Sequence, residues 1–319
     1  MGILGFSRYA LTISAAAAML AGCGGSQPPV GAPGALPQAS AIANHHLKGK
    51  SGSGDLIYAA SNGVSYVFTY PAGKLVGSIN FGAQDICSDN SGNVYLPVDT
   101  NIYEFSHGAT KPTATLNVLG AGRGCAVDPS SGNLAVTFYP ASGSDVAIFH
   151  NGQVSYYNME PSPQYCGYDN EGNLFLDYPT NDGSLGFVEL PAGESQFQTI
   201  TITPPLNNNA LGRIQWDGTY LTLESGIKRH RAPHVQQIDR LSISGSTATV
   251  VGITNLRGIR RAATLSWIYD GAVIVPFGNA GNLSRNLGYW KYPKGGKPAT
   301  TIKNPVGQTL NALTISVAP

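Results

Sequence analysis

A short turn motif recurs along most of this chain and limits the folds that the chain can adopt. The motif Asp-x-x-Gly-Asn occupies Asp89–Asn93 and Asp169–Asn173, and a copy one residue longer occupies Asp128–Asn133. Degenerate copies occur at Trp216–Gly218 and Tyr269–Gly271, so that successive Asp residues are 39, 41, 48 and 53 positions apart. Asp and Asn side chains cap such turns, while Gly adopts the positive φ that a hairpin requires. The spacing therefore predicts a repeated β-hairpin.

A second turn follows each hairpin and extends the repeat. It occurs at Tyr70–Gly73, Phe105–Gly108, Leu190–Gly193 and Tyr292–Gly295, each time before a short strand-like segment. One unit therefore has four strands in about 40–50 residues, which is typical of a β-propeller blade. Five full units begin near Gln84, Arg123, Gln164, Arg213 and Arg261.

The two ends of the repeat region supply one further blade. Residues Asp55–Asn80 contain only three strand-like segments, and Leu310–Ser316 reads as an unpaired inner strand. Joining them closes the ring and removes two exposed sheet edges. We therefore predict an all-β, six-bladed β-propeller over residues 54–319, with the first blade closed by the C-terminal strand. The repeat resembles NHL-type propellers, in which an inner strand precedes Asp-x-x-Gly-Asn, and is similar to uncharacterised exported bacterial propeller proteins.

The N-terminus has the features of an export signal. Arg8 precedes an apolar segment, Tyr9–Leu20, which is too short to span a bilayer. Leu20-Ala21-Gly22-Cys23 resembles the lipobox of bacterial lipoproteins, which implies removal of residues 1–22 and acylation of Cys23 with palmitate-type chains. Gly24 rather than Asp follows the cysteine, which by analogy implies an outer-membrane location in a cell that has two membranes. An ordinary secretory signal with an incidental cysteine is the other interpretation.

Residues 23–53 are rich in Gly, Pro and Ser and have no hydrophobic periodicity, so we expect a flexible tether. After it, charge is divided unevenly. Residues 54–204 hold 3 Lys/Arg and 14 Asp/Glu, a net charge of −11, whereas residues 205–319 hold 13 and 4, a net charge of +9. Such asymmetry influences association rather than fold.

Three cysteines remain after Cys23, all on predicted inner strands. Cys87 lies two residues before its turn Asp, whereas Cys125 and Cys166 lie three residues before theirs. Strand side chains alternate, so Cys87 faces the opposite way from the other two. This register predicts a Cys87–Cys125 disulfide across one blade interface, which an oxidising compartment would permit. With the opposite sense of alternation, all three would be buried thiols.

Polar residues gather where the predicted inner strands begin, which is the usual mouth of a propeller channel. Arginines and amides outnumber carboxylates there, so no metal site or cofactor is predicted, because a hard divalent metal needs several oxygen anions. A ring of Arg and amide groups suits an anionic ligand such as a sugar acid or a phosphate. Alternatively, these arginines pair with neighbouring carboxylates or extend to solvent. The candidate ligand-binding residues are Asp85, Arg123, Gln164, Arg213, Arg261 and Asn311.

A basic insertion in the fifth blade and the junction that follows it form a second candidate surface. It could bind an acidic polysaccharide or anionic lipid, or be merely a solvated loop. Nucleic acid is not an expected partner, since the chain is exported and its net charge is only +1. The residues of this basic patch are Lys228, Arg229, Arg231, Arg257 and Arg260.

No catalytic motif occurs in the sequence: it has no phosphate loop, no Gly-x-Ser-x-Gly elbow and no His-Glu-x-x-His. No catalytic residue is therefore assigned. The predicted function is that of a non-catalytic, monomeric protein that is lipid-anchored in the cell envelope. It recognises an envelope protein or anionic glycan through its propeller loops. The alternative is a lactonase- or lyase-like enzyme that acts at the channel mouth on a small anionic or sugar-derived substrate.

Overall fold

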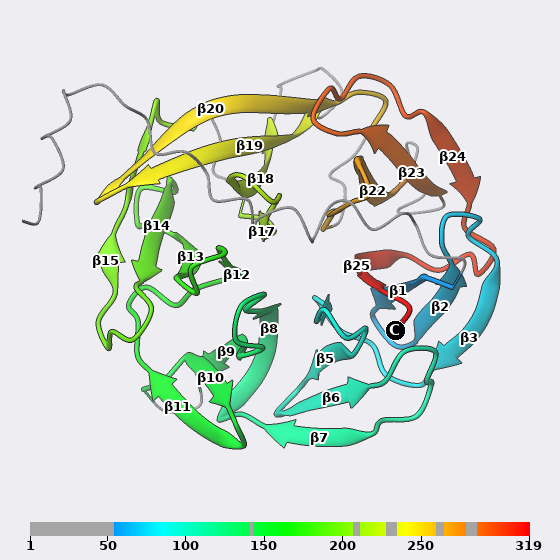
Figure 1. Cartoon of the computed structure of the whole chain (residues 1–319), viewed down its shortest axis with the longest axis horizontal. Helices are drawn as coiled ribbons and strands as arrows, with labels where there is room; N and C mark the ends of the chain where they lie inside the picture. Colours follow the sequence, from blue (N-terminus) through cyan, green and yellow to red (C-terminus); the bar gives the residue numbers. More distant parts are fainter. Residues whose placement is uncertain (1–53, 141–142, 207–210, 228–234, 260–264, 279–285) are drawn as a thin grey trace, which may run out of the picture. The chain divides into compact units, whose positions relative to one another are not determined.

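The computed structural model describes residues 54–140, 143–206, 211–227, 235–259, 265–278 and 286–319. Over these ranges the chain forms six small sheets that follow one another around a ring (Figure 1). They contain no helix, and therefore no helix that could span a membrane. The prediction of an all-β, six-bladed propeller is confirmed. The predicted signal peptide and tether lie outside the described residues.

Each sheet is a blade whose innermost strand lies nearest the ring axis. Blade 2 has the order β4-β5-β6-β7, and blades 3, 4 and 6 repeat this meander. The strands of these four blades are β4 (Cys87–Ser88), β5 (Val94–Val98), β6 (Asn101–Phe105), β7 (Ala114–Asn117), β8 (Gly120–Val127), β9 (Leu134–Pro140), β10 (Val146–His150), β11 (Gln153–Tyr157), β12 (Cys166–Tyr168), β13 (Leu174–Pro179), β14 (Leu185–Leu190), β15 (Gln198–Thr199), β21 (Trp267–Tyr269), β22 (Ala272–Phe277), β23 (Asn286–Lys291) and β24 (Thr300–Lys303).

Blade 5 departs from the meander by carrying an additional strand. It consists of β17 (Ile214–Trp216), β18 (Leu221–Ile227), β19 (Val235–Ser244) and β20 (Thr247–Leu256). A fifth strand, β16 (Thr201–Thr203), pairs with β20 in parallel. The longer spacing between turn Asp residues in this part of the sequence is therefore accommodated partly by the ten-residue strands β19 and β20.

Blade 1 is built from both ends of the propeller. Its order is β25-β1-β2-β3, with β25 at Leu310–Ser316, β1 at Leu56–Ser61, β2 at Ser65–Thr69 and β3 at Leu75–Ile79. β25 pairs antiparallel with β1, from Leu56 opposite Ser316 to Ala60 opposite Ala312. The predicted closure of the first blade by the C-terminal strand is confirmed.

Side chains at the two ends reinforce this closure. The Asp55 carboxylate accepts hydrogen bonds from the Ala318 backbone N–H at 2.9 Å and from the Tyr269 hydroxyl at 2.8 Å. His107 of blade 2 contacts both ends as well, with Nδ1 2.8 Å from Ser316 Oγ and Nε2 3.1 Å from the Gly54 carbonyl oxygen. The junction is therefore fixed by strand pairing and by hydrogen bonds from two neighbouring blades.

The recurring Asp turn has the predicted capping chemistry. Asp89 Oδ1 accepts hydrogen bonds from the Ser91 and Asn93 backbone N–H groups, and Oδ2 accepts one from Asn93 Nδ2. Asp169 repeats these contacts in blade 4, and the glycines of the two turns, Gly92 and Gly172, have φ of 84° and 83°. The turns place the ends of the innermost strands at one end of the ring axis.

The hydrophobic core is divided among the interfaces between blades. Each of six clusters of buried residues combines side chains that neighbouring sheets contribute, and the largest fully buried side chains include Trp290, Tyr58 and Phe138. Burial of a large apolar side chain stabilises the fold by about 1.5–3 kcal/mol. The core therefore lies between the blades rather than on the ring axis.

Candidate functional site

Among the described residues, two cavities lie at the centre of the ring, at opposite ends of the innermost strands. We call them the strand-start cavity and the strand-end cavity. The strand-start cavity has a volume of about 400 Å³ and is lined by Asn62, Gln84, Tyr165, Leu211, Gly212, Glu224, Leu265 and Asn311. The strand-end cavity has a volume of about 370 Å³, and all six innermost strands line it, through Cys87 and Ser88, Cys125–Val127, Gly167 and Tyr168, Ile214–Trp216, Trp267–Tyr269 and Ile315.

An ion pair crosses the axis between blades 2 and 5, which face each other in the ring (Figure 1). Arg213 Nη2 donates to Asp85 Oδ1, and also to the Ile86 carbonyl oxygen at 3.2 Å. Both side chains are buried. In the sequence Arg213 stands between Gly212, which lines the strand-start cavity, and Ile214, which lines the strand-end cavity. The pair therefore lies where the two cavities meet.

Asp85 has further partners that hold its carboxylate in place. The Ile86 backbone N–H donates to Oδ1 at 2.8 Å, and the Cys125 N–H of blade 3 donates to Oδ2 at 3.1 Å. Burial raises the pKa of Asp85, while Arg213 and these two backbone donors oppose that shift. The charge of Arg213 is therefore compensated inside the ring.

The other residues predicted for the channel mouth are not brought together around one ligand. Arg123 packs its guanidinium carbon 3.2 Å from the centroid of the Tyr139 ring and donates from Nη1 to the Pro163 carbonyl oxygen at 3.1 Å. Gln164 is half-buried, and its backbone carbonyl oxygen accepts a hydrogen bond from the Thr137 hydroxyl at 2.7 Å. Both residues therefore serve contacts between blades 3 and 4.

Asn311 lines the strand-start cavity but is also engaged by its own blade. Its Nδ2 donates to Asn62 Oδ1 at 2.6 Å and to the Ala83 carbonyl oxygen at 3.0 Å. Arg261, the remaining candidate, lies outside the described residues. Among the five candidates that the structure describes, Asp85 and Arg213 are the two that are joined by a direct hydrogen bond.

Two buried carboxyl groups near the strand-start cavity escaped the sequence analysis, because each lies on a second strand rather than an innermost one. Asp177 of β13 accepts from the Tyr165 and Gly212 backbone N–H groups at 2.7 and 2.9 Å. Glu224 of β18 accepts from the Ser266 N–H and hydroxyl, both at 2.8 Å. Burial raises the pKa of each group to about 7. Each carboxyl group binds the blade that follows its own.

Trp216 and Trp267, two of the half-buried aromatic side chains of the strand-end cavity, were also missed as site residues. Trp216 was read only as part of a degenerate turn, although it is the last residue of an innermost strand. Trp267 begins β21, and the Arg213 guanidinium carbon lies 4.9 Å from its ring centroid. An aromatic residue directly before a turn Asp, as in Trp216-Asp217 and Tyr269-Asp270, was the available signal.

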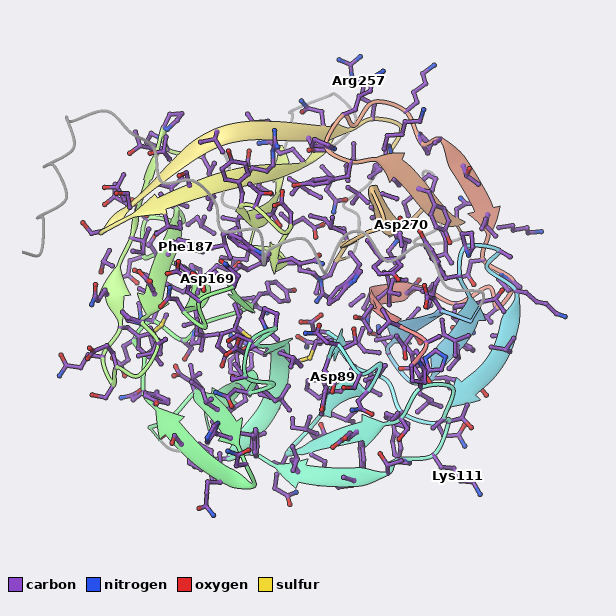
Figure 2. All side chains as sticks on the ribbon, viewed as in Figure 1. Asp89, Lys111, Asp169, Phe187, Arg257 and Asp270 are labelled. Atoms are coloured by element: carbon purple, nitrogen blue, oxygen red, sulfur yellow. A yellow bond between two sulfur atoms is a disulfide. The ribbon has the colours of Figure 1, made fainter. Side chains whose placement is uncertain are left out.

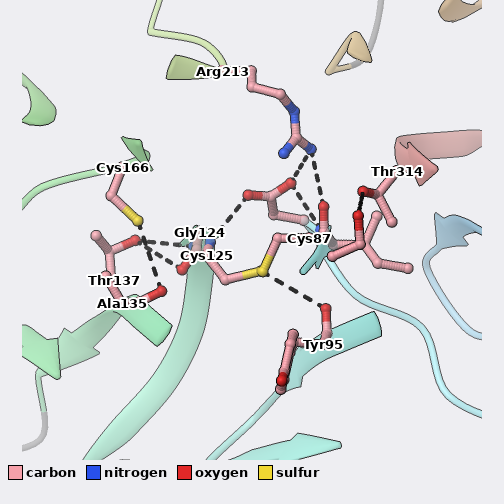
Figure 3. The surroundings of a disulfide bond; sticks show 12 residues. Cys87, Tyr95, Gly124, Cys125, Ala135, Thr137, Cys166, Arg213 and Thr314 are labelled. Carbon is pink, nitrogen blue, oxygen red and sulfur yellow. Dashed lines mark hydrogen bonds and ion pairs between the residues drawn. A yellow bond between two sulfur atoms is a disulfide. The ribbon is translucent and has the colours of Figure 1, made fainter. Parts of the chain in front are cut away.

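Next to the ion pair, a disulfide joins Cys87 to Cys125, with their Cα atoms 5.8 Å apart (Figure 3). This is the pair that the register argument predicts. Cys166 is a buried thiol whose Sγ lies 3.9 Å from the Ala135 carbonyl oxygen of blade 3. Cys125 and Cys166 therefore both face the preceding blade, whereas Cys87 faces the following one.

Within the described ranges, no group of three or more His, Cys, Asp or Glu side chains is placed to hold a metal ion. Of the predicted basic patch, Arg257 is exposed at the outer edge of the ring (Figure 2), and Lys228, Arg229, Arg231 and Arg260 lie outside the described residues. Blade 6 adds further positive charge after the patch in the sequence. Its exposed lysines are Lys291, Lys294, Lys297 and Lys303.

Comparison with known proteins supports the fold alone. No protein-family model matches the chain, and no curated protein matches it. A chain solved in a nidogen/laminin complex is 12% identical, with a TM-score of 0.62 over 83% of this chain and 99% of that one. A protein of unknown function from Bacteroides caccae is 10% identical, with a TM-score of 0.58 over 82% of this chain and 98% of that one. A functionally unknown protein from Desulfotomaculum acetoxidans is 10% identical, with a TM-score of 0.56 over 83% and 99%.

Proposed function

We propose that this chain is an exported lipoprotein whose propeller binds a ligand or partner at the cell envelope and catalyses no reaction. One observation carries the binding role: the charged groups Arg213, Asp85 and Asp55 at the ring axis already have partners within the protein. Arg213 pairs with Asp85, and the Asp55 carboxylate accepts from Tyr269 and Ala318. Groups that are held in this way shape a rigid surface rather than exchange protons with a substrate.

The anchor rests on Leu20-Ala21-Gly22-Cys23 and on the apolar segment before it. Several acyl chains on Cys23 would give firm membrane attachment, because each buried CH₂ contributes about 0.8 kcal/mol. Asp55 and Ala318 both line the strand-end cavity. Both ends of the propeller therefore lie at this cavity.

The basic patch and the blade 6 lysines favour an anionic glycan or an acidic envelope protein as partner. At the level of fold, the similarity to a chain solved in a nidogen/laminin complex supports a role in binding another macromolecule. Arg257, the residue of the patch that the structure describes, lies at the outer edge of the ring (Figure 2), so partner binding there would leave both cavities open.

The experiment that tests this function has two arms. Wild-type protein and Cys23→Ser are expressed with a radiolabelled palmitate precursor, and we expect label and membrane association only in the wild type. The labelled protein is then purified with its envelope, and co-purifying proteins and glycans are identified by mass spectrometry. Equal labelling of Cys23→Ser contradicts the anchor, and a native protein that retains no envelope component contradicts the binding role.

One observation favours the enzymatic alternative, a lactonase- or lyase-like activity in the strand-start cavity. Glu224 lines that cavity beside Tyr165, and its pKa of about 7 suits a general acid or base at neutral pH. Hydrolysis of a panel of sugar lactones by the wild type, lost in Glu224→Gln at unchanged thermal stability, would support this alternative. No turnover by either protein favours the binding role.

A further inference from the structure

The strand-end cavity is lined by aromatic side chains and by the guanidinium group of Arg213. Trp216, Trp267 and Tyr269 come from the neighbouring blades 5 and 6, and each is half-buried. Arg213 lies beneath Trp267, with its guanidinium carbon 4.9 Å from the ring centroid. The volume of about 370 Å³ falls within the range of small-molecule sites. Aromatic side chains in such a cavity offer flat apolar faces on which a planar molecule can stack.

Hydrogen-bond donors are more available in this cavity than acceptors. The indole N–H groups of Trp216 and Trp267 have no acceptor among the described residues, and neither nitrogen is completely buried. The Asp55 carboxylate and the Gln215 side chain, which line the same cavity, already have hydrogen-bond partners. Asp55 accepts from Tyr269 and Ala318, and the Gln215 side chain exchanges two hydrogen bonds with the Ile268 backbone. A ligand that brings its own acceptor would therefore satisfy the indole donors.

Charge argues for a neutral ligand. The positive charge of Arg213 is compensated by Asp85. Asp55 and Asp89 also line the cavity. A carboxylate or phosphate would meet those two acidic groups without a free counter-charge. A cation would meet the Arg213 guanidinium and would leave both indole donors unsatisfied. An uncharged acceptor avoids both costs, since burying an unpaired charge or donor is unfavourable.

We propose that the strand-end cavity binds an uncharged, planar, largely apolar molecule that carries a carbonyl-type acceptor. The aromatic faces of Trp216 and Trp267 hold the flat body, and their N–H groups donate to the acceptor. The inference rests on the proposed binding function but not on lipidation of Cys23. It places ligand recognition at the end of the channel opposite to the mouth that the sequence suggested.

A matched series of probes tests the three parts of this proposal. The full-length chain, labelled with ¹⁵N at its tryptophans, is titrated with 2-naphthamide, 2-naphthoate, 2-naphthylmethylammonium and naphthalene. We expect 2-naphthamide to shift the indole signals of Trp216 and Trp267. The signal of Trp290 should stay in place, because that side chain is fully buried in blade 6 and donates to the Arg257 carbonyl oxygen. The other three probes should bind at least about fivefold more weakly.

Variants separate stacking from hydrogen bonding. Trp216→Leu should weaken 2-naphthamide binding about fivefold or more through loss of the aromatic face, and Trp216→Phe should recover part of that loss. Tyr66→Leu, which changes an aromatic residue of blade 1 outside the cavity, is the matched control and should bind as the wild type does. Thermal melting of each variant shows whether it is folded.

Three results would overturn the proposal: equal binding of the naphthoate, tighter binding of the ammonium compound, or no movement of the Trp216 and Trp267 signals. If the probes fail while an envelope component still co-purifies, the cavity proposal is wrong and the binding function stands. If the probes bind while no envelope component co-purifies, the cavity proposal stands and envelope recognition is wrong.

Discussion

Arg213 of blade 5 reaches across the ring axis and donates from Nη2 to Oδ1 of Asp85 in blade 2, 128 residues away in the sequence. Both side chains are buried, and Asp85 Oδ2 also accepts a hydrogen bond from the Cys125 backbone N–H in the innermost strand of blade 3. The contact therefore couples three blades at the centre of the molecule. It also occupies two of the four charged side chains that the sequence offered as ligand-binding residues.

Loss of one partner of this pair should be strongly destabilising. In Arg213→Met the Asp85 carboxylate is left buried without its counter-charge, and we expect a loss of about 3–5 kcal/mol in the free energy of unfolding. Urea denaturation measures the loss. The double variant Asp85→Asn with Arg213→Met carries no uncompensated charge and should be more stable than Arg213→Met alone. A double variant that is no more stable would show that the charge is not the cause.

Stability should fall as the pH rises from about 4 to about 7. Burial raises the folded-state pKa of Asp177 and Glu224 to about 7, whereas the ordinary values are 3.8 and 4.5. The folded protein therefore holds more protons than the unfolded chain within this window, and deprotonation destabilises it. Melting temperatures at pH 5 and pH 8 measure the effect. Asp177→Asn with Glu224→Gln should flatten the profile, and an unchanged slope in that variant would contradict the assignment.

Removal of the closing strand should open the ring. Deletion of residues 310–319 takes away the buried Leu310, Leu313 and Ile315 and exposes the edge of β1, so we expect a loss on the order of 5 kcal/mol together with aggregation. Deletion of Pro319 alone keeps both β25 and the Ala318 contact with Asp55, and is the matched control. Calorimetry and light scattering report both effects. Equal melting of the longer deletion and the intact protein would mean that β25 contributes little.

The disulfide should add measurable stability. The loop between Cys87 and Cys125 spans 38 residues, for which the chain-entropy model gives about 4 kcal/mol. Cys87→Ala with Cys125→Ala should lower the free energy of unfolding by an amount of this order, whereas Cys166→Ala removes only a buried thiol. Non-reducing peptide mapping should recover the Cys87–Cys125 pair. Recovery of a Cys125–Cys166 pair would contradict the register on which the assignment depends.

Binding of the protein to anionic surfaces should depend on the basic patch and should weaken as the salt concentration rises. Arg229, Arg231 and Arg260 changed together to Glu should reduce binding to anionic glycans or vesicles at low ionic strength. Lys111→Glu, an exposed change in blade 2, is the control. Exposed charges are screened beyond about 8 Å at physiological ionic strength, so wild-type binding should fall as salt is added. If the wild type and the triple variant bind the anionic glycans or vesicles equally well, the basic patch is only a solvated surface.

The fold could be predicted because its signals are local and repeated. Asp89 and Asp169 cap their turns by binding residues only two and four positions away. A short segment of sequence is therefore enough to predict these hydrogen bonds. The unpaired strand at Leu310–Ser316 required only that the blades be counted. The pairing of Cys87 with Cys125 followed from alternation within two aligned strands.

The centre of the ring could not be predicted in the same way. Asp85 and Arg213 were both selected for their position at strand starts, but their mutual contact depends on which blades face each other across the axis. Glu224 was missed because its carboxyl group binds Ser266 of the next blade, 42 residues away, and no local pattern marks that contact. Contacts across the axis join residues that are far apart in the sequence. The repeat predicts the strands of each blade but not which residues of different blades meet at the axis.

The pairing of β1 with β25 has a consequence for the order in which the molecule is completed. Leu56 is among the first residues of the propeller to be synthesised, and its partner Ser316 is among the last. Contacts between such distant positions form slowly, because a long loop must close before they yield any stabilisation. Blades 2 to 6 can each assemble from continuous sequence, but blade 1 has to wait for the end of the chain. A chain that crosses a membrane unfolded would thus be kept from closing its ring until its last strand had emerged.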